Sequence, residues 1–233
     1  MPESLPLLPL DLLAIAWFIV VWTAYSYLVE ASPWSRHSLS RVMDAQRLVW
    51  MRAMSEREQR IVDASIMNGL QNGTAFFAST AVLAIGGSFA LLTSADQVLL
   101  IFSHLSPNGP MNRRELEIRG LGLLLVYAYA FFKFGWSYRL FNYASILVGA
   151  VPPPAACRTL EGEAAVRRAA DMIVSAGRHF NRGMRAFFFS IGFIGWFVGP
   201  VSFMAATLAI SVILARRQFV SDSYRAVERA GAA

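Results

Sequence analysis

The sequence predicts an all-α integral membrane protein, a four-helix bundle with long amphipathic helices extending into the cytoplasm. Apolar residues make up 56% of the 233 positions and charged residues only 15%, whereas a soluble domain carries about 25% charged residues. The apolar residues also gather in runs of about 20 residues or more, the length that a helix needs to cross about 30 Å of hydrocarbon. We therefore expect a single membrane domain over residues 1–233.

Four apolar runs are long enough to be membrane spans. They cover residues 10–28, 74–92, 121–141 and 186–215. The opening Met1-Pro2-Glu3-Ser4 has no positive charge and no clear cleavage site follows it, so the first run is expected to be a retained span rather than a cleaved signal peptide. Three prolines at 152–154 end the third helix, because proline lacks the amide donor and forces the preceding residue out of helical geometry.

Two segments between these runs are expected to be helical. In 38–65 and 161–185 apolar residues recur at helical spacing with arginines between them. Such helices could lie on the inner membrane surface, where arginine meets anionic lipid. Alternatively they run on into the following spans and form a bundle that projects into the cytoplasm. We favour the second arrangement, because only Gly69 and Gly73 interrupt the approach to the second span.

The arginines predict the orientation. With four spans the termini share one side, and the segments 31–67 and 151–185 share the other. Those two segments hold twelve arginines and the opposite side holds seven. The positive-inside rule then predicts a bacterial inner-membrane protein with both termini in the periplasm. Membrane topology accounts for the net charge of +6, and nucleic-acid binding would need a further motif that the sequence does not carry.

An ordered set of short motifs resembles a known family. The motifs are Arg60-Ile61-Val62-Asp63, Phe76-Phe77-Ala78-Ser79-Thr80, Gly86-Gly87, Lys133-Phe134-Gly135-Trp136-Ser137, Asn142-Tyr143 and His179-Phe180-Asn181-Arg182-Gly183-Met184-Arg185-Ala186. Together they resemble the bacterial and plant membrane-protein family catalogued as domain of unknown function 599. The resemblance implies a multi-pass membrane protein of unassigned activity and supplies no catalytic residues.

Lys133 is the main intramembrane candidate, because every other basic side chain apart from histidine is an arginine and a cation at membrane depth needs a partner, a wet cavity or a route to the interface. Tyr129 and Ser137 fall on the same helical face. Three roles are open: an interhelical anchor, a transport pathway, or snorkelling to the interface. Asp63 and Asp11 are the expected carboxylate partners of an anchor, with backbone carbonyls as the alternative.

The densest polar cluster precedes the fourth run and contains Arg178, His179, Arg182 and Arg185. Unpaired, these arginines would form a phosphate or lipid-headgroup site. Paired with carboxylates of other helices, they would join those helices instead. The candidate carboxylates are Asp44, Glu56, Glu58 and Asp171. A histidine among arginines has its pKa lowered, so His179 is expected to be neutral.

Glycines predict close helix contacts and a bend. Gly69 and Gly73, and again Gly195 and Gly199, have the small-xxx-small spacing that lets helices approach one another, within the bundle or in a dimer. The Gly199-Pro200 pair is expected to bend the fourth span, because the proline ring clashes one turn back. A static kink and a hinge for alternating access are both open.

Several chemistries lack their residues. His37, His104 and His179 lie outside the predicted spans, which disfavours a haem between membrane helices, and Cys157 is a lone cysteine. We expect no cofactor, no metal and no enzymatic activity. The partners expected are anionic lipid headgroups at the cytoplasmic arginines, and a partner membrane protein or further copies of the chain.

Two functions fit this description. The first is a non-enzymatic structural or accessory component of a membrane complex. The second is a small transporter or channel whose pathway includes Lys133. A wet cavity that reaches an unpaired Lys133 would favour transport, and a dry bundle would favour the accessory role.

Overall fold

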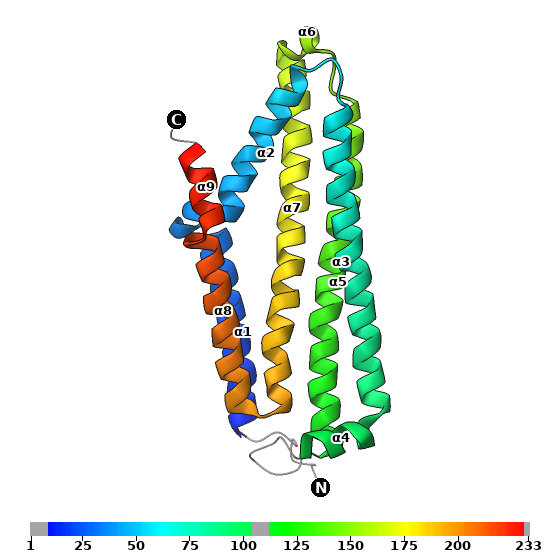
Figure 1. Cartoon of the computed structure of the whole chain (residues 1–233), viewed down its shortest axis with the longest axis vertical. Helices are drawn as coiled ribbons and strands as arrows, with labels where there is room; N and C mark the ends of the chain where they lie inside the picture. Colours follow the sequence, from blue (N-terminus) through cyan, green and yellow to red (C-terminus); the bar gives the residue numbers. More distant parts are fainter. Residues whose placement is uncertain (1–8, 104–111, 231–233) are drawn as a thin grey trace.

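A computed structural model describes residues 9–103 and 112–230, so the opening Met1-Pro2-Glu3-Ser4 and His104 lie outside the described residues. The described part is all helical and elongated (Figure 1). The α-helices are α1 (Pro9–Glu30), α2 (Leu39–Ser55), α3 (Ile61–Thr93), α4 (Ala95–Ser103), α5 (Arg113–Gly149), α6 (Pro154–Cys157), α7 (Leu160–Ile194), α8 (Pro200–Phe219) and α9 (Asp222–Ala230). Two short 3-10 helices, η1 (Pro33–His37) and η2 (Gly195–Phe197), join them.

Four helical stretches are long and apolar enough to cross a membrane. They are Pro9–Glu30, Ile61–Thr93, Arg113–Gly149 and Pro200–Val227. This confirms the multi-pass, all-α architecture that the composition predicts. The first three contain the predicted runs 10–28, 74–92 and 121–141 and extend beyond them.

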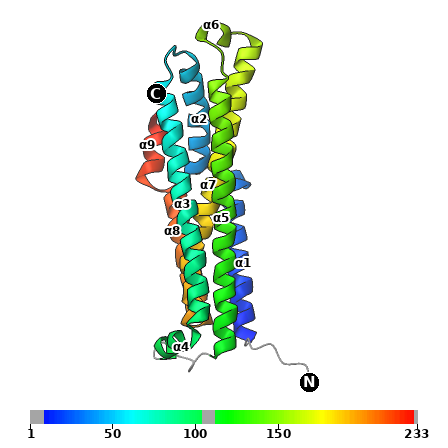
Figure 2. The same cartoon turned by 90° about the vertical axis from the view of Figure 1, so that its right-hand side faces the viewer.

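Long helices continue past the apolar layer and form an arm. We use "the arm" for α2, α6 and the parts of α3, α5 and α7 that lie beyond the end of α1; Figures 1 and 2 show these helices side by side along the long axis. Helix α3 passes through Gly69 and Gly73 without a break, and α7 runs unbroken from Leu160 to Ile194. The segment 161–185 therefore runs on into the layer within α7, as favoured from the sequence. The predicted helix 38–65 is instead interrupted, because α2 ends at Ser55 and α3 begins at Ile61.

Side-chain caps fix where three of these helices begin. The side chain of Ser38 accepts a hydrogen bond from the Arg41 amide at the start of α2, and Thr159 accepts one from Gly162 at the start of α7. Asn112 does the same at α5. Each cap satisfies an amide that the first helical turn leaves without a partner.

The fourth predicted span, 186–215, is not one helix. Helix α7 ends at Ile194, η2 follows, and α8 starts at Pro200 after an extended Gly199 (φ 159°, ψ 167°). The chain reverses here, and α8 packs against α7 so closely that a Cβ on Gly192 would lie 3.2 Å from the Cα of Thr207. Proline suits the first turn of a helix, where no amide donor is needed. The predicted bend at Gly199-Pro200 is therefore a hairpin turn.

This reversal changes the predicted topology. Helices α1 and α8 run parallel (Figure 1). The Trp17 indole of α1 donates to the Met204 carbonyl near the start of α8, and the amide of Ser40, which follows α1 at the start of α2, donates to Gln218 near the end of α8. The start of α1 and the end of α8 consequently lie at opposite ends of the apolar layer (Figure 1). The expectation that both termini share one side does not hold for this arrangement.

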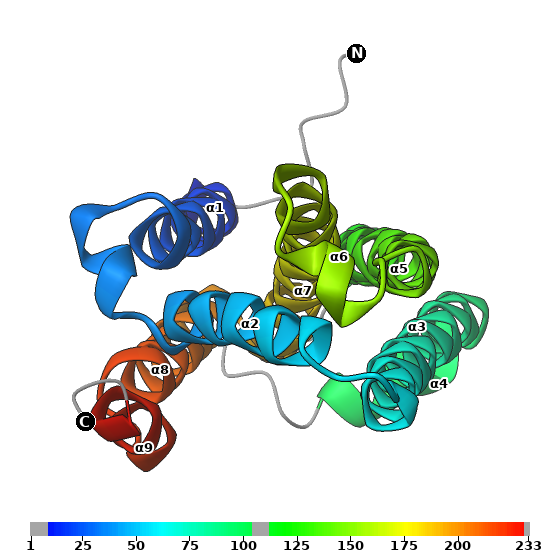
Figure 3. The ribbon, with the colours of Figure 1, turned by 90° about the horizontal axis from the view of Figure 1, so that it is seen from above.

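Helix α7 lies between α1 and α8 on one side and α5 on the other (Figure 3). Aromatic rings fill the space around its lower half: Trp22 stacks on Phe189 at 5.4 Å, and Trp196 stacks on Phe203 at 5.3 Å. By contrast, α3 buries a single seam, which faces α5 over most of its length and Trp50 of α2 at Asp63. That seam consists of Asp63, Met67, Thr74, Ala81 and Ser88. Most of the remaining surface of α3 faces outward.

Candidate functional site

Polar side chains inside the bundle gather in two clusters. The lower cluster consists of Asp11, Arg119 and Trp196. Arg119 Nη2 lies 3.4 Å from Asp11 Oδ1, the Trp196 indole donates to the same oxygen at 2.7 Å, and the guanidinium stacks over the Trp196 ring at 5.5 Å. All three residues are buried. Sequence reasoning missed Arg119, because it precedes the third predicted span by two residues and was assigned to a loop.

The upper cluster consists of Glu30, Arg182 and Arg185. Arg182 donates from Nη2 to Glu30 Oε2 at 2.6 Å and from Nε to Glu30 Oε1 at 3.0 Å, and Arg185 Nη2 also donates to Oε1. Glu30 was not among the predicted partners of these arginines. The available signal was its position as a carboxylate that ends the first apolar run.

The two clusters mark the limits of the apolar layer. Asp11 and Glu30 are nineteen residues apart on α1, which is about 28 Å at 1.5 Å per residue. This distance matches the hydrocarbon thickness of a bilayer, about 30 Å. The ion pairs thus join helices at both edges of the layer, where water and lipid headgroups reduce the cost of a charge.

Arg178 has the carboxylate partner expected from the sequence. Its Nε lies 3.0 Å from Asp44 Oδ2 on α2, and Arg47 binds the other oxygen of Asp44 at 2.6 Å. Arg178 therefore joins α7 to α2, while Arg182 and Arg185 join α7 to α1. The three predicted arginines are interhelical contacts at the base of the arm.

His179 is half-buried beside Trp136, with ring centroids 6.4 Å apart. Burial lowers its pKa, the positive charges of Lys133 and Arg182 lower it further, and Glu30 opposes them. The lowered pKa agrees with the neutral histidine expected from the sequence, although burial lowers this pKa more than the neighbouring positive charges do.

Lys133 lies in the same region without a carboxylate. Its ammonium is 5.1 Å from the centroid of the Tyr129 ring, and the described residues include no ion pair to it. Both expected partners bind elsewhere: Asp63 accepts from Trp50 and Arg57 in the arm, and Asp11 binds Arg119. Lys133 is fourteen residues beyond Arg119 on α5, about 21 Å up the layer, and so closer to the upper cluster.

Ser137 has a role separate from Lys133. It is fully buried, and its hydroxyl donates to the carbonyl oxygen of Ala176 at 2.7 Å. This bond ties α5 to α7 at the base of the arm. Tyr129 instead turns toward α1, where it packs edge-on against Trp22 at 5.7 Å.

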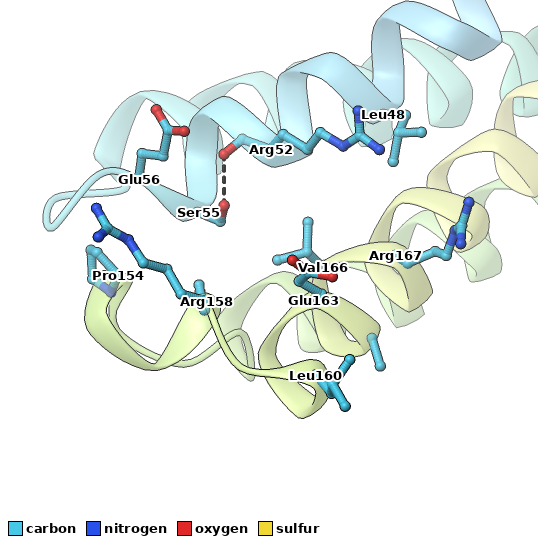
Figure 4. A pocket seen from close by; sticks show the side chains of 12 residues that line it. Leu48, Arg52, Ser55, Glu56, Pro154, Arg158, Leu160, Glu163, Val166 and Arg167 are labelled. Atoms are coloured by element: carbon cyan, nitrogen blue, oxygen red, sulfur yellow. Dashed lines mark hydrogen bonds between the residues drawn. The ribbon is translucent and has the colours of Figure 1, made fainter.

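A hollow with a volume of about 660 Å³ lies at the tip of the arm. Figure 4 shows Arg52 of α2 and Glu56, which directly follows α2, on one side, and Arg158 and Glu163 on the other, beside α6 and at the start of α7. Two smaller cavities adjoin the upper cluster, and a fourth lies between α1 and α8. Lys133 lines none of the four.

The helices, their length and the paired charges at both edges of the layer define a multi-pass helical membrane protein with a projecting arginine-rich arm. The chain belongs to the family described as protein of unknown function, DUF599, whose model matches residues 13–223. No curated protein and no solved structure matches the chain.

Proposed function

We propose that the protein is a non-enzymatic structural or accessory component of a bacterial inner-membrane complex. The observation that carries the proposal is the continuity of α3, α5 and α7 from the apolar layer into the arm. A helix that continues without a break holds the arm rigidly upright on the membrane. An arm of this kind presents a fixed surface to a partner.

We place the arm in the cytoplasm. Because the chain reverses at Gly199, the arginines after residue 215 lie on the same side of the layer as the arm. That side carries sixteen arginines, and the other carries Arg113, Arg114 and Arg119. The asymmetry is larger than the four-span topology gives, and the positive-inside rule therefore favours a periplasmic start of α1 and a cytoplasmic end of α8.

The hollow at the arm tip is the surface that we propose for the partner. Three arginines, Arg52, Arg158 and Arg167, line it together with apolar residues such as Leu48 and Val166, and they outnumber its two carboxylates, Glu56 and Glu163. None of these three arginines forms an ion pair with another described residue. An acidic segment with apolar side chains fits a groove of this composition, because unpaired guanidinium groups bind carboxylates through paired hydrogen bonds. Exposed arginines nearer the layer would contact anionic lipid.

The environment of Lys133 favours this role over transport. A transport pathway needs a wet cavity that reaches the ammonium, whereas Lys133 packs on Tyr129 and lines none of the cavities described above. The side chain lies in the upper third of the layer, from which a lysine can snorkel to the interface.

Photo-crosslinking tests the proposal. A benzoylphenylalanine at Arg167, in the tip groove, is expected to give one discrete protein adduct in cells. A matched substitution at Leu83, 75% exposed on the layer part of α3, is expected to give none. An adduct of twice the chain mass would identify a second copy as the partner. The absence of any adduct at Arg167, together with no protein copurifying in native lipid particles, would refute the accessory role.

A further inference from the structure

A polar cavity lies at the base of the arm, where α1 ends and α2 begins. It has a volume of about 110 Å³ and is lined from α1, α2 and α7. Its charged residues are Arg41, Arg178, Arg182, Arg185, Glu30 and Asp44. Four guanidinium groups thus share two carboxylates around a space large enough for one small anion.

The ion pairs leave positive charge in this cavity. Glu30 is occupied by Arg182 and Arg185, and Asp44 by Arg178 and by Arg47 from outside the cavity. Arg41 is exposed and forms no ion pair with any described side chain. Arg185 is 7% exposed, and its Nη1 is buried without a hydrogen-bond partner. A buried charged donor without an acceptor is costly, so an anion beside it would stabilise the site.

The start of α2 adds to the positive potential. Ser40 and Arg41 belong to the first turn of this 17-residue helix and both line the cavity. The amides of Ser40 and Arg41 already donate to Gln218 and Ser38, so the contribution of this helix start is its dipole, which favours a negative charge at a helix N-terminus. The Ser40 hydroxyl and the Asn181 amide, 3.5 Å apart, supply further polar groups.

A second cavity of about 280 Å³ continues from the first into the apolar layer. The two share Val29, Ser40, Asn181 and Arg185. Large apolar side chains form one part of the lining of the second cavity, namely Tyr25, Leu39, Phe180, Met184, Phe188 and Leu214, and polar residues that include Arg217, Gln218, Ser221 and Ser223 form the other. The combined space therefore joins a cationic part, lined by arginines, to a part with an apolar wall.

We propose that this continuous space binds a phosphate ester, with the phosphate beside Arg41 and Arg185 and an apolar portion in the second cavity. Arginine binds phosphate through paired, charge-assisted hydrogen bonds. The phosphate can come from an anionic phospholipid or from a soluble phosphate compound, and the apolar continuation favours the phospholipid. The inference rests on the proposed function only in taking the apolar layer to be a membrane, and it requires no protein partner.

Ligand-induced thermal stabilisation in neutral detergent tests the site. The probes are dihexanoyl phosphatidylglycerol, dihexanoylglycerol without a phosphate, and inorganic phosphate. We expect the phosphatidylglycerol to raise the melting temperature and the uncharged dihexanoylglycerol to have little effect. Arg41→Gln is expected to weaken binding about tenfold or more, the usual loss for a hydrogen bond to a charged group, and Arg41→Lys is expected to weaken it less.

Arg36→Gln is the matched control, because Arg36 is exposed in η1 near the same surface but lines neither cavity. Weak binding of inorganic phosphate beside tight binding of phosphatidylglycerol supports a lipid ligand, and equal binding supports a soluble one. Equal stabilisation by dihexanoylglycerol, or equal weakening by Arg36→Gln and Arg41→Gln, overturns the proposal. Because this readout involves no other protein, it can fail while the crosslinking experiment succeeds.

Discussion

Asp11 of α1 and Arg119 of α5 form a buried ion pair at the lower edge of the apolar layer, 108 residues apart in the sequence. Glu115 Oε2 lies 3.7 Å from the same guanidinium group, and the Trp196 indole donates to Asp11. Helices α1 and α5 and the 3-10 helix η2 thus meet at one charged group. The pair and its hydrogen bonds fix the relative height of α1, α5 and the hairpin between α7 and α8.

Breaking this pair should strongly destabilise the bundle. Arg119→Met leaves the Asp11 carboxylate buried with only the Trp196 indole as a donor, and an uncompensated buried charge costs about 3–5 kcal/mol. We expect a large drop in the melting temperature, which can be measured in detergent by tryptophan fluorescence. Adding Asp11→Asn to this variant should restore much of the loss, because the amide keeps an acceptor for Trp196.

Arg113→Gln provides the control for this measurement. Arg113 pairs with Asp96 and Glu117 on the surface and is 61% exposed, so its loss should cost no more than about 1 kcal/mol. Equal destabilisation by Arg113→Gln and Arg119→Met would show that the buried pair has no special role.

Lys133→Met should be tolerated. The substitution removes a cation–π contact with Tyr129, worth about 0.5–1 kcal/mol, but it also removes the cost of holding a cation in the layer, about 2.5–3.5 kcal/mol on insertion scales. We expect an unchanged or raised melting temperature and unchanged insertion. A loss of several degrees would indicate an anchoring partner for Lys133. Tyr129→Leu serves as a companion variant that removes the ring and keeps the charge.

Two glycine substitutions should have opposite effects. A Cβ at Gly162 would lie 2.3 Å from the carbonyl oxygen of Ala156, a backbone atom, whereas a Cβ at Gly69 would meet nothing within 4 Å. Gly162→Ala should therefore lower stability by about 1–3 kcal/mol through overpacking, and Gly69→Ala should be neutral or stabilising by up to about 1 kcal/mol. Melting temperatures of both variants check this. Destabilisation by Gly69→Ala would indicate a helix docked on that open face.

Local patterns predicted most of the helices. Apolar runs and helical periodicity placed three layer helices and the continuity of α3 and α7, because these features depend on residues close together in the chain. The sequence did not predict the hairpin at Gly199, because the apolar run 186–215 is long enough for one tilted helix. The run is interrupted by only three residues that favour turns, Gly195, Gly199 and Pro200. Length and hydropathy do not distinguish a bend from a reversal.

The polar contacts were less predictable. Composition identified Arg178, Arg182 and Arg185 as a cluster, and Arg178 does bind Asp44. The other two bind Glu30, more than 150 residues earlier. Such a pairing depends on how whole helices pack and leaves no local signature. The charge of Asp63 and Asp11 was the sole reason to expect them as partners of Lys133. In the structure Asp63 pairs with Arg57 in the arm and Asp11 pairs with Arg119 at the lower edge of the layer.

The neutral state of His179 should make stability fall with acidity. Its pKa in the fold lies below the ordinary value of 6.5, so the unfolded chain binds a proton first as the pH falls. Its contribution to stability is complete above about pH 6.5 and is lost as the pH falls through the lowered pKa. When the pH is lowered from 7.5 to 5.5, we expect the melting temperature of His179→Gln to fall by less than that of the native protein.

His37 provides the comparison, because it is exposed in η1. His37→Gln should reproduce the acid sensitivity of the native protein. If His179→Gln and His37→Gln both follow the native pH profile, the acid sensitivity arises from other groups and the burial of His179 has no energetic consequence.

The reversal at Gly199 should be visible in cells. Ser94, between α3 and α4, and Ser223, in α9, lie on opposite sides of the layer in this fold, whereas four spans would place them on the same side. Single cysteines at these positions, in a chain whose buried Cys157 is replaced by alanine, can be labelled with a membrane-impermeant maleimide. We expect Ser94→Cys to react in intact spheroplasts and Ser223→Cys only after permeabilisation. Labelling of both cysteines before permeabilisation, or of neither, would contradict the hairpin. The reverse pattern would keep the hairpin and place the arm outside the cytoplasm, because the two positions would still differ.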